Sequence, residues 1–263
     1  MKVYKLLFCF MISITGYTQV SHSFWLGLTQ AGSDILGDSS GGSMNYYLDW
    51  KLKNSHTLQA RVGADINFDE SNSKLHDARL RHRFDFYSND IWKVQSELRV
   101  YLPFSEGSQD NKGIIPRVDY SVTFSSAPKF KETDFSAVFY FKPMYTRNFN
   151  DTDFIAIKPD DPLSQIKNTI NGILSNQFIV ALNYSKFYLE LYFSYNTKWD
   201  SVGRRVDDEF ATAQDLYFTI NDTFQLMVGH FNGSSLYNEQ GQRQTLSFDS
   251  DQDIFYVNGI INF

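Results

Sequence analysis

Beyond its first residues, the sequence has no apolar run long enough to form a transmembrane helix, which requires about 20 apolar residues. If the chain enters a membrane, it must do so as a closed barrel, because only helices and closed barrels satisfy every backbone hydrogen bond in lipid. Cysteine is nearly absent, and the single Cys9 lies near the start, so we expect no disulfide framework. Only six prolines occur and 17% of the residues are aromatic, a composition that leans away from disorder.

The first residues have the order of a secretory signal peptide. Lys2 and Lys5 precede an apolar run over 6–14, and small and polar residues follow that run. We therefore expect a signal peptide over residues 1–18 and one mature domain over 19–263.

A lipid anchor on Cys9 is the alternative at this end of the chain, but the bulky Phe8 stands where a lipoprotein signal requires a small residue. The formal net charge is −6, and it becomes −8 without Lys2 and Lys5. This acidic balance argues against a nucleic-acid partner.

From residue 22 onward, apolar and polar residues alternate over runs of about ten, which is the signature of transmembrane strands. In the run 57–68, for example, Val62 lies in the apolar phase and Arg61 in the polar phase. We expect about twelve strands, near 22–32, 44–53, 57–68, 78–87, 91–103, 116–125, 135–147, 176–184, 187–198, 210–220, 223–231 and 254–263. The predicted fold is all-β, a closed antiparallel transmembrane barrel with Leu48, Val62, Val94 and Leu182 facing lipid.

The connections between these strands alternate in length. Tight ones are expected at Asn54-Ser55, Asn89-Asp90, Ser185-Lys186 and Asn221-Asp222, with a moderate one over 127–134. Long ones are expected near 33–43, 69–77, 104–115, 148–175, 199–209 and 232–253. Short periplasmic turns and long extracellular loops are typical of bacterial barrels, so we expect the outer membrane of a Gram-negative bacterium as the location.

Aromatic residues gather at the strand ends next to the tight turns, where a barrel carries an interfacial girdle. The predicted periplasmic girdle includes Trp50, Phe86, Trp92, Phe187 and Phe224. The sequence also ends on an alternating strand whose last residue is Phe263. This strand resembles the C-terminal signal by which outer-membrane barrels engage the barrel assembly machinery.

One segment, 160–175, departs from the two-residue period. Asp161 is a candidate N-cap, Pro162 suits the first helical position, and Ile166 and Ile170 fall on one helical face. We expect a short helix within a long outer loop, either as a cap on neighbouring loops or as a lid at the mouth.

Arginine is concentrated in the inward phase of the strand over 78–87, where Arg79, Arg81 and Arg83 follow one another. The neighbouring strands add Arg61, Lys93, Arg99 and Arg117 in the same phase. Guanidinium groups bind carboxylate or phosphate in a two-pronged fashion, so the row is a candidate anion track along a pore. Acidic residues such as Asp65, Asp85 and Glu97 share this phase, so a lumen closed by ion pairs is the alternative.

The local string Arg81-His82-Arg83-Phe84, together with a narrow barrel and a basic inner wall, resembles the oligogalacturonate-specific monomeric porins. This resemblance implies passive diffusion of small anionic solutes, such as acidic oligosaccharides, past the arginine row. The chain departs from that pattern because acids alternate with the bases and because it carries the 160–175 segment.

An enzyme is a further alternative, because some outer-membrane barrels are hydrolases. His230, Asn232, Ser234 and Ser235 are the nearest candidates, but they lack the histidine-x-serine spacing on one strand face, so no catalytic residues are expected. Acidic clusters at Asp207, Asp208 and Glu209 and at Asp249, Asp251 and Asp253 lack the spacing of a calcium loop. We expect neither a metal nor a cofactor.

The expected function is a porin-like channel with a small anionic solute as its cargo. The expected partners are outer-membrane lipid, lipopolysaccharide and the barrel assembly machinery. The alternative function is a structural or adhesive barrel with a closed lumen, acting through its extracellular loops.

Overall fold

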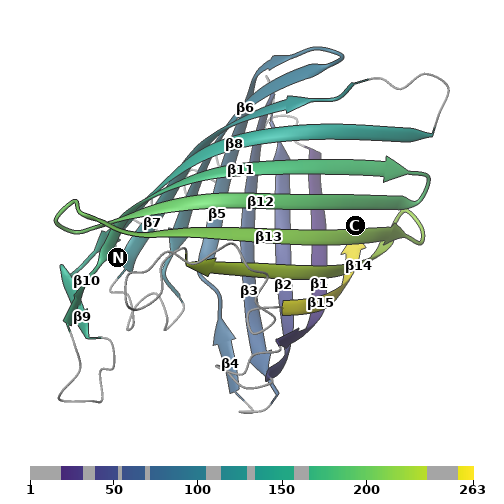
Figure 1. Cartoon of the computed structure of the whole chain (residues 1–263). Helices are drawn as coiled ribbons and strands as arrows, with labels where there is room; N and C mark the ends of the chain where they lie inside the picture. The colour runs from purple at the N-terminus through teal and green to yellow at the C-terminus, as the bar shows by residue number, and fades with distance from the viewer. Residues whose placement is uncertain are drawn as a thin grey trace.

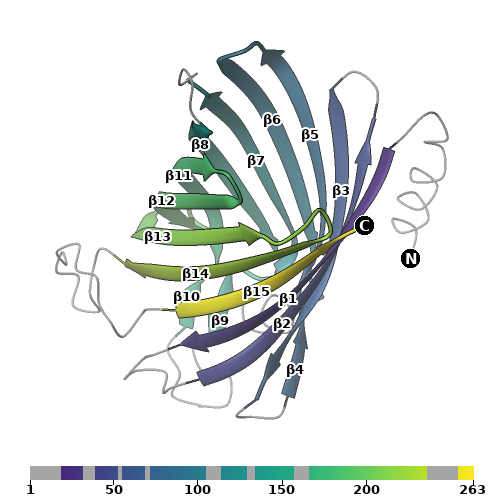
Figure 2. The ribbon, with the colours of Figure 1, turned by 90° about the vertical axis from the view of Figure 1, so that its right-hand side faces the viewer.

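The computed structural model describes residues 19–31, 39–52, 55–68, 72–104, 114–128, 134–156, 166–235 and 254–263. Within them, twelve antiparallel strands form one closed barrel (Figure 1). These strands are β1 (Gln19–Ala31), β2 (Ser39–Lys51), β3 (His56–Asn67), β5 (Ala78–Ser88), β6 (Trp92–Leu102), β7 (Ile114–Ser126), β8 (Phe135–Asn150), β11 (Ile170–Tyr184), β12 (Phe187–Asp200), β13 (Arg205–Thr219), β14 (Phe224–Ser235) and β15 (Ile254–Asn262). Each pairs with its neighbours in chain order, and β1 pairs with β15 to close the ring (Figure 2). The predicted twelve-stranded barrel is confirmed.

Three short strands lie outside the ring. Strand β4 (Asn72–Leu75) pairs with the end of β3, and β9 (Phe154–Ala156) and β10 (Ile166–Asn168) form a separate two-stranded ribbon (Figure 1). All three belong to connections at the long-loop end of the barrel, which they extend beyond the ring.

The two-residue period separates the outer wall of the barrel from the inner wall. Val62 is 52% exposed and pairs with Tyr46, which is also exposed, whereas the next pair, Arg61 and Tyr47, lies on the other face. Exposed apolar side chains recur in the same phase around the ring, including Leu98, Phe141, Phe178, Leu216 and Val228. An apolar surface of this extent is stable only in lipid, so the outer wall is the membrane face.

The turns at one end of the barrel are tight, as predicted. Ser55 and Ser185 have positive φ angles of 64° and 54°, the left-handed conformation that lets two antiparallel strands reverse within a few residues. At the other end, the prediction of a long loop over 199–209 is wrong. Strand β12 runs to Asp200 and β13 begins at Arg205, because polar residues continue the pairing above the apolar band.

The predicted helix over 160–175 is also wrong for its described part. Residues 166–168 form β10, and Ile170 begins β11, while residues 157–165 lie outside the described residues. β-branched residues fit strands well, and pairing of β11 with β8 and β12 outweighs the weak helical period of the isolated segment. Among the described residues, no helix is long and apolar enough to cross a membrane.

Candidate functional site: the inner wall of the barrel

The predicted basic residues lie together on the inner face of four neighbouring strands. Strand β5 carries Arg79, Arg81 and Arg83, and cross-strand pairing places Arg61 beside Arg79 and Arg99 beside Arg81. Lys93 lies on β6 and Arg117 on β7, both in the same inward phase. We call these seven side chains the basic wall.

A buried carboxylate lies in the middle of the basic wall. Glu97 is 4% exposed, and its oxygens lie 3.6 Å from Arg81 Nη1, 2.5 Å from Arg99 Nη2 and 2.7 Å from Lys142 Nζ. Three cations therefore surround one anion, which leaves an excess of positive charge in this cluster. Sequence reasoning missed Lys142, although the two-residue period of β8 places it on the inner face.

The basic side chains of this wall are more exposed towards its ends, with Lys93 at 43% and Arg117 at 36%, although Asp119 is itself buried. Lys93 Nζ lies 2.8 Å from Asp85, and Arg117 Nε lies 3.4 Å from Asp119. Arg83 lies 3.9 Å from Asp49, the outer limit of an ion pair. The side chains of Arg83 and Lys93 line a cavity of about 410 Å³ inside the barrel at its tight-turn end.

Two members of the basic wall lack a carboxylate partner within the described ranges. Arg61 donates from Nε to Asn45 Oδ1 at 2.8 Å, and Arg79 donates from Nη2 to Gln59 Oε1 at 2.8 Å. Both guanidinium carbons lie 5.9 Å from the centroid of the Tyr47 ring. Asp65, an expected partner of the arginines, instead pairs with His76 at 2.6 Å.

Many donors of the basic wall remain unused. Within the described part of the chain, the buried Nε atoms of five of its arginines have no hydrogen-bond partner: Arg79, Arg81, Arg83, Arg99 and Arg117. These Nε atoms have no exposed surface, but the side chains of Arg83, Arg99 and Arg117 are 18–36% exposed, so their guanidinium groups can meet an acceptor such as a carboxylate or phosphate from the lumen.

The opposite wall of the lumen is acidic and rich in tyrosine. Glu190 on β12 and Asp215 on β13 are directly paired neighbours, and β13 lies six strands from β5 in a ring of twelve. Tyr188 Oη donates to Glu190 at 2.6 Å, and Tyr256 Oη donates to Asp215. Neither carboxylate has an ion pair with any described cation.

The acidic wall and the basic wall face each other across the lumen, since β13 lies half-way around the ring from β5. A solute between them is therefore exposed to cationic donors on one side and to carboxylate and hydroxyl acceptors on the other.

The residues of the predicted aromatic girdle lie on the outer face near the tight turns. Phe86 and Trp92 are exposed, and a register shift between Asp85 and Tyr87 turns the consecutive Phe86 and Tyr87 outwards. The girdle positions on the other strands are Trp50, Phe187 and Phe224. Phe263 is exposed and exchanges two backbone hydrogen bonds with His22 at the β1–β15 seam, while its role in assembly stays a prediction.

The two histidines that sequence reasoning discussed both lie on the outer face. His230 Nδ1 lies 2.8 Å from Gln214 Oε1, and its ring contacts Phe255. His82 lies on β5 in the same outward phase as its apolar neighbours Leu58 and Leu98. It stacks on His56, with 2.9 Å between His56 Nδ1 and His82 Nε2, so a specific polar contact holds it on this face.

The acidic cluster predicted for a loop at 207–209 lies instead within β13. Asp207 and Glu209 face Lys198 on the inner side, and Asp208 pairs with Arg205 on the outer side, so the alternation of the strand separates them. The described residues contain no group of three or more side chains that could hold a metal ion. Asp249, Asp251 and Asp253 lie outside the described residues.

Comparisons with known proteins agree on the fold. No family model matches the chain, and no curated protein matches it. The structure of the NanC porin aligns with a TM-score of 0.55 and 11% identity, over 91% of this chain and 98% of NanC. The COG4313 outer membrane channel from Pseudomonas putida F1 aligns with a TM-score of 0.53 and 12% identity, over 94% of this chain and 96% of the channel.

Sequence identity is near 10% in both alignments, so neither one assigns a role to an individual residue of this chain. The shared property is the fold, a closed antiparallel barrel. The chain therefore has the fold of the Gram-negative outer-membrane porins, and the outer membrane is where a barrel with this outer wall resides.

Proposed function

We propose that the protein is a passive channel for small hydrophilic solutes with an anionic group, such as acidic oligosaccharides, which move along the basic wall. The observation that carries this proposal is the row of partly exposed guanidinium groups along one side of the lumen. A carboxylate or phosphate that leaves water needs such donors in return for its lost hydration.

The opposite wall supports the same proposal. Glu190 and Asp215 repel an anion, so the anionic group of a solute is directed towards β5 and away from β13. Their oxygens accept hydrogen bonds, which suits the hydroxyl groups of a solute that spans the lumen. The arrangement favours solutes with an acidic side and a polar neutral side.

A closed lumen is the second candidate, and the buried Glu97 cluster favours it. Charged side chains that neutralise one another can fill a narrow barrel and leave it impermeable. Such a barrel acts as a structural or adhesive protein through its extracellular loops. The excess of cations over anions in the cluster argues against complete neutralisation.

Planar-bilayer recording of the purified protein tests the proposal. We expect stepwise conductance with a reversal potential that reports anion preference in a salt gradient. Replacing Arg79, Arg81 and Arg83 together by glutamine should keep conductance and reduce or reverse that preference, because a Debye length of about 8 Å leaves charges on the wall only partly screened for a nearby ion. The matched triple lysine variant keeps the charge and should keep the preference.

Two results decide between the candidates. Absence of conductance at every voltage and pH favours the closed barrel. Conductance with unchanged anion preference in the triple glutamine variant contradicts the role of the basic wall.

The remaining expectations belong to this proposal. Residues 1–18 direct export as a signal peptide, residues 19–263 form the mature barrel, and the strand ending at Phe263 engages the barrel assembly machinery. The protein needs no cofactor and performs no catalysis in this role.

A further inference from the structure

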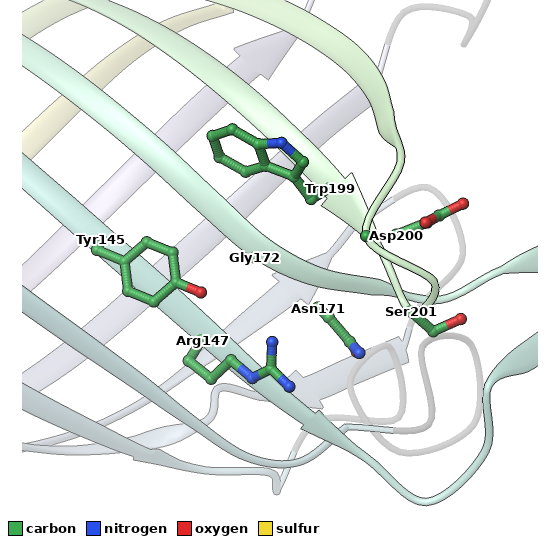
Figure 3. Close-up of a pocket in the computed structure, with 8 residues that line it drawn as sticks. Tyr145, Arg147, Asn171, Gly172, Trp199, Asp200 and Ser201 are labelled. Carbon is green, nitrogen blue, oxygen red and sulfur yellow. The ribbon is translucent and has the colours of Figure 1, made fainter.

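A second cavity lies on the outside of the barrel, near the rim at the long-loop end. It has a volume of about 390 Å³ and is bounded by β8, β11, β12 and the β12–β13 turn (Figure 3). Arg147, Gly172 and Trp199 line it as cross-strand neighbours in the same phase as the lipid-facing residues. The cavity is therefore separate from the lumen and from the basic wall.

The height of this cavity corresponds to the outer boundary of the apolar band. Twelve residues separate the strand positions at the tight-turn end from those in the cavity, namely Phe135 from Arg147, Tyr184 from Gly172 and Phe187 from Trp199. At about 3.3 Å per residue and a tilt of about 40°, this is a height of about 30 Å. Since the apolar band of such barrels is about 25 Å tall, the cavity lies at the level of the lipid headgroups.

Arg147 provides an available positive charge in the cavity. Its cross-strand neighbours are Val118 and Gly172, and no described residue forms an ion pair or a hydrogen bond with its guanidinium. The other two described arginines next to the cavity are engaged, since Arg204 pairs with Asp200 at 3.0 Å and Arg205 pairs with Asp208.

The described residues around Arg147 supply donors and no free acid. Asn171 accepts a hydrogen bond from Asn150 through its Oδ1, which leaves its amide N–H groups to donate beside the guanidinium (Figure 3). Asp200 is held within its own turn by the backbone N–H groups of residues 202 and 204, and its carboxylate points away from Arg147 (Figure 3). The polar part of the cavity therefore suits an anion.

The remaining surface of the cavity is flat and aromatic. The rings of Tyr145 and Trp199 flank Gly172, and a Cβ atom at this glycine would lie 3.1 Å from Tyr145 Oη. Absence of a side chain at Gly172 thus keeps the cavity open. Exposed Leu174 and Phe178 continue the outer wall towards the membrane centre, where acyl chains would lie.

We propose that this cavity binds the phosphate-bearing headgroup of a lipid in the outer leaflet. Guanidinium and amide donors bind phosphate oxygens, aromatic rings at the interface pack against the headgroup, and the apolar strand surface accepts the acyl chains. A membrane lipid is the source that satisfies both the anion site and the apolar surface below it, and the inference does not depend on what passes through the lumen.

Native mass spectrometry of the full detergent-solubilised barrel tests this assignment. The probe is lipid A with its phosphates, compared with the same lipid after dephosphorylation and with inorganic phosphate. We expect one tightly retained phosphorylated lipid per barrel. Arg147→Gln should bind this lipid at least about tenfold more weakly than the wild type, because one charge-assisted contact is lost. Gly172→Leu should also weaken binding, since it fills the cavity and leaves the charge in place.

The matched control is Arg205→Gln, which removes an arginine from the same rim outside the cavity and should leave binding unchanged. Heat-modifiable migration on gels verifies that each variant is folded. Equal lipid binding by the wild type, Arg147→Gln and Gly172→Leu would overturn the assignment. A loss of binding in Arg205→Gln as large as that in Arg147→Gln would also overturn it, because the overall charge of the rim would then explain the binding. Retention of the dephosphorylated lipid, or displacement of lipid A by stoichiometric inorganic phosphate, would overturn it as well.

Discussion

Removal of the Glu97 carboxylate tests whether the basic wall is held together by a central anion. In Glu97→Gln the side-chain volume is kept, but Arg81, Arg99 and Lys142 lose their shared counter-ion. With an effective dielectric constant of about 20, each contact near 3 Å contributes about 5 kcal/mol before desolvation is subtracted. Breaking a buried pair costs about 3–5 kcal/mol net, and we expect a loss of unfolding free energy of this size.

Urea titration of the folded barrel measures this loss. With a slope of about 1–3 kcal/mol per molar urea, the midpoint should fall by about 1 M or more. The control is Asp85→Asn, which breaks the more accessible pair with Lys93 and should cost at most about 1 kcal/mol. Anion preference in the bilayer should rise in Glu97→Gln. A variant with the wild-type midpoint and wild-type selectivity would refute the counter-ion role of Glu97.

Three further outcomes follow from the barrel geometry. Cysteine at position 61 should react with a membrane-impermeant thiol reagent and cysteine at position 62 should not, because Arg61 faces the lumen and Val62 faces lipid; equal labelling would contradict the alternation. Val62→Arg should cost up to about 2–4 kcal/mol in urea titrations, depending on its depth in the bilayer, with Val62→Leu as the control. Ser185→Gly should stabilise the barrel by about 1 kcal/mol, because its positive φ of 54° strains a side chain, whereas Ser185→Val should destabilise it.

The fold was predictable because one local rule applies to nearly the whole chain. Each strand separates lipid from the lumen, so the two-residue period identifies both the strand and its orientation. The rule weakens above the membrane, where both faces of a strand contact water. This is why the polar ends of β12 and β13, around Lys198 and Asp207, were expected to be a loop.

The site was predictable only in part. The alternation along a strand shows which face a side chain lies on, whereas the register between strands decides which side chains become its neighbours. Phase placed Arg79, Arg81 and Arg83 on the inner face, but their partners depend on how far neighbouring strands are displaced along one another. Glu97 meets Lys142 from a strand two places away, a contact that the local sequence does not encode. The opposite acidic wall was overlooked because Glu190 lies within the mainly apolar string FYLELYF.

The β1–β15 seam affects the order in which the strands of this barrel pair during folding. Most neighbouring ring strands are joined by a local connection, whereas Ser23 pairs with Asn262 across nearly the whole chain. Closing such a span costs about 3 kcal/mol more in chain entropy than closing a ten-residue hairpin. Until that pairing forms, β1 and β15 are open edges that any other strand can join. The barrel thus passes through a long, aggregation-prone period that ends when its first and last strands meet.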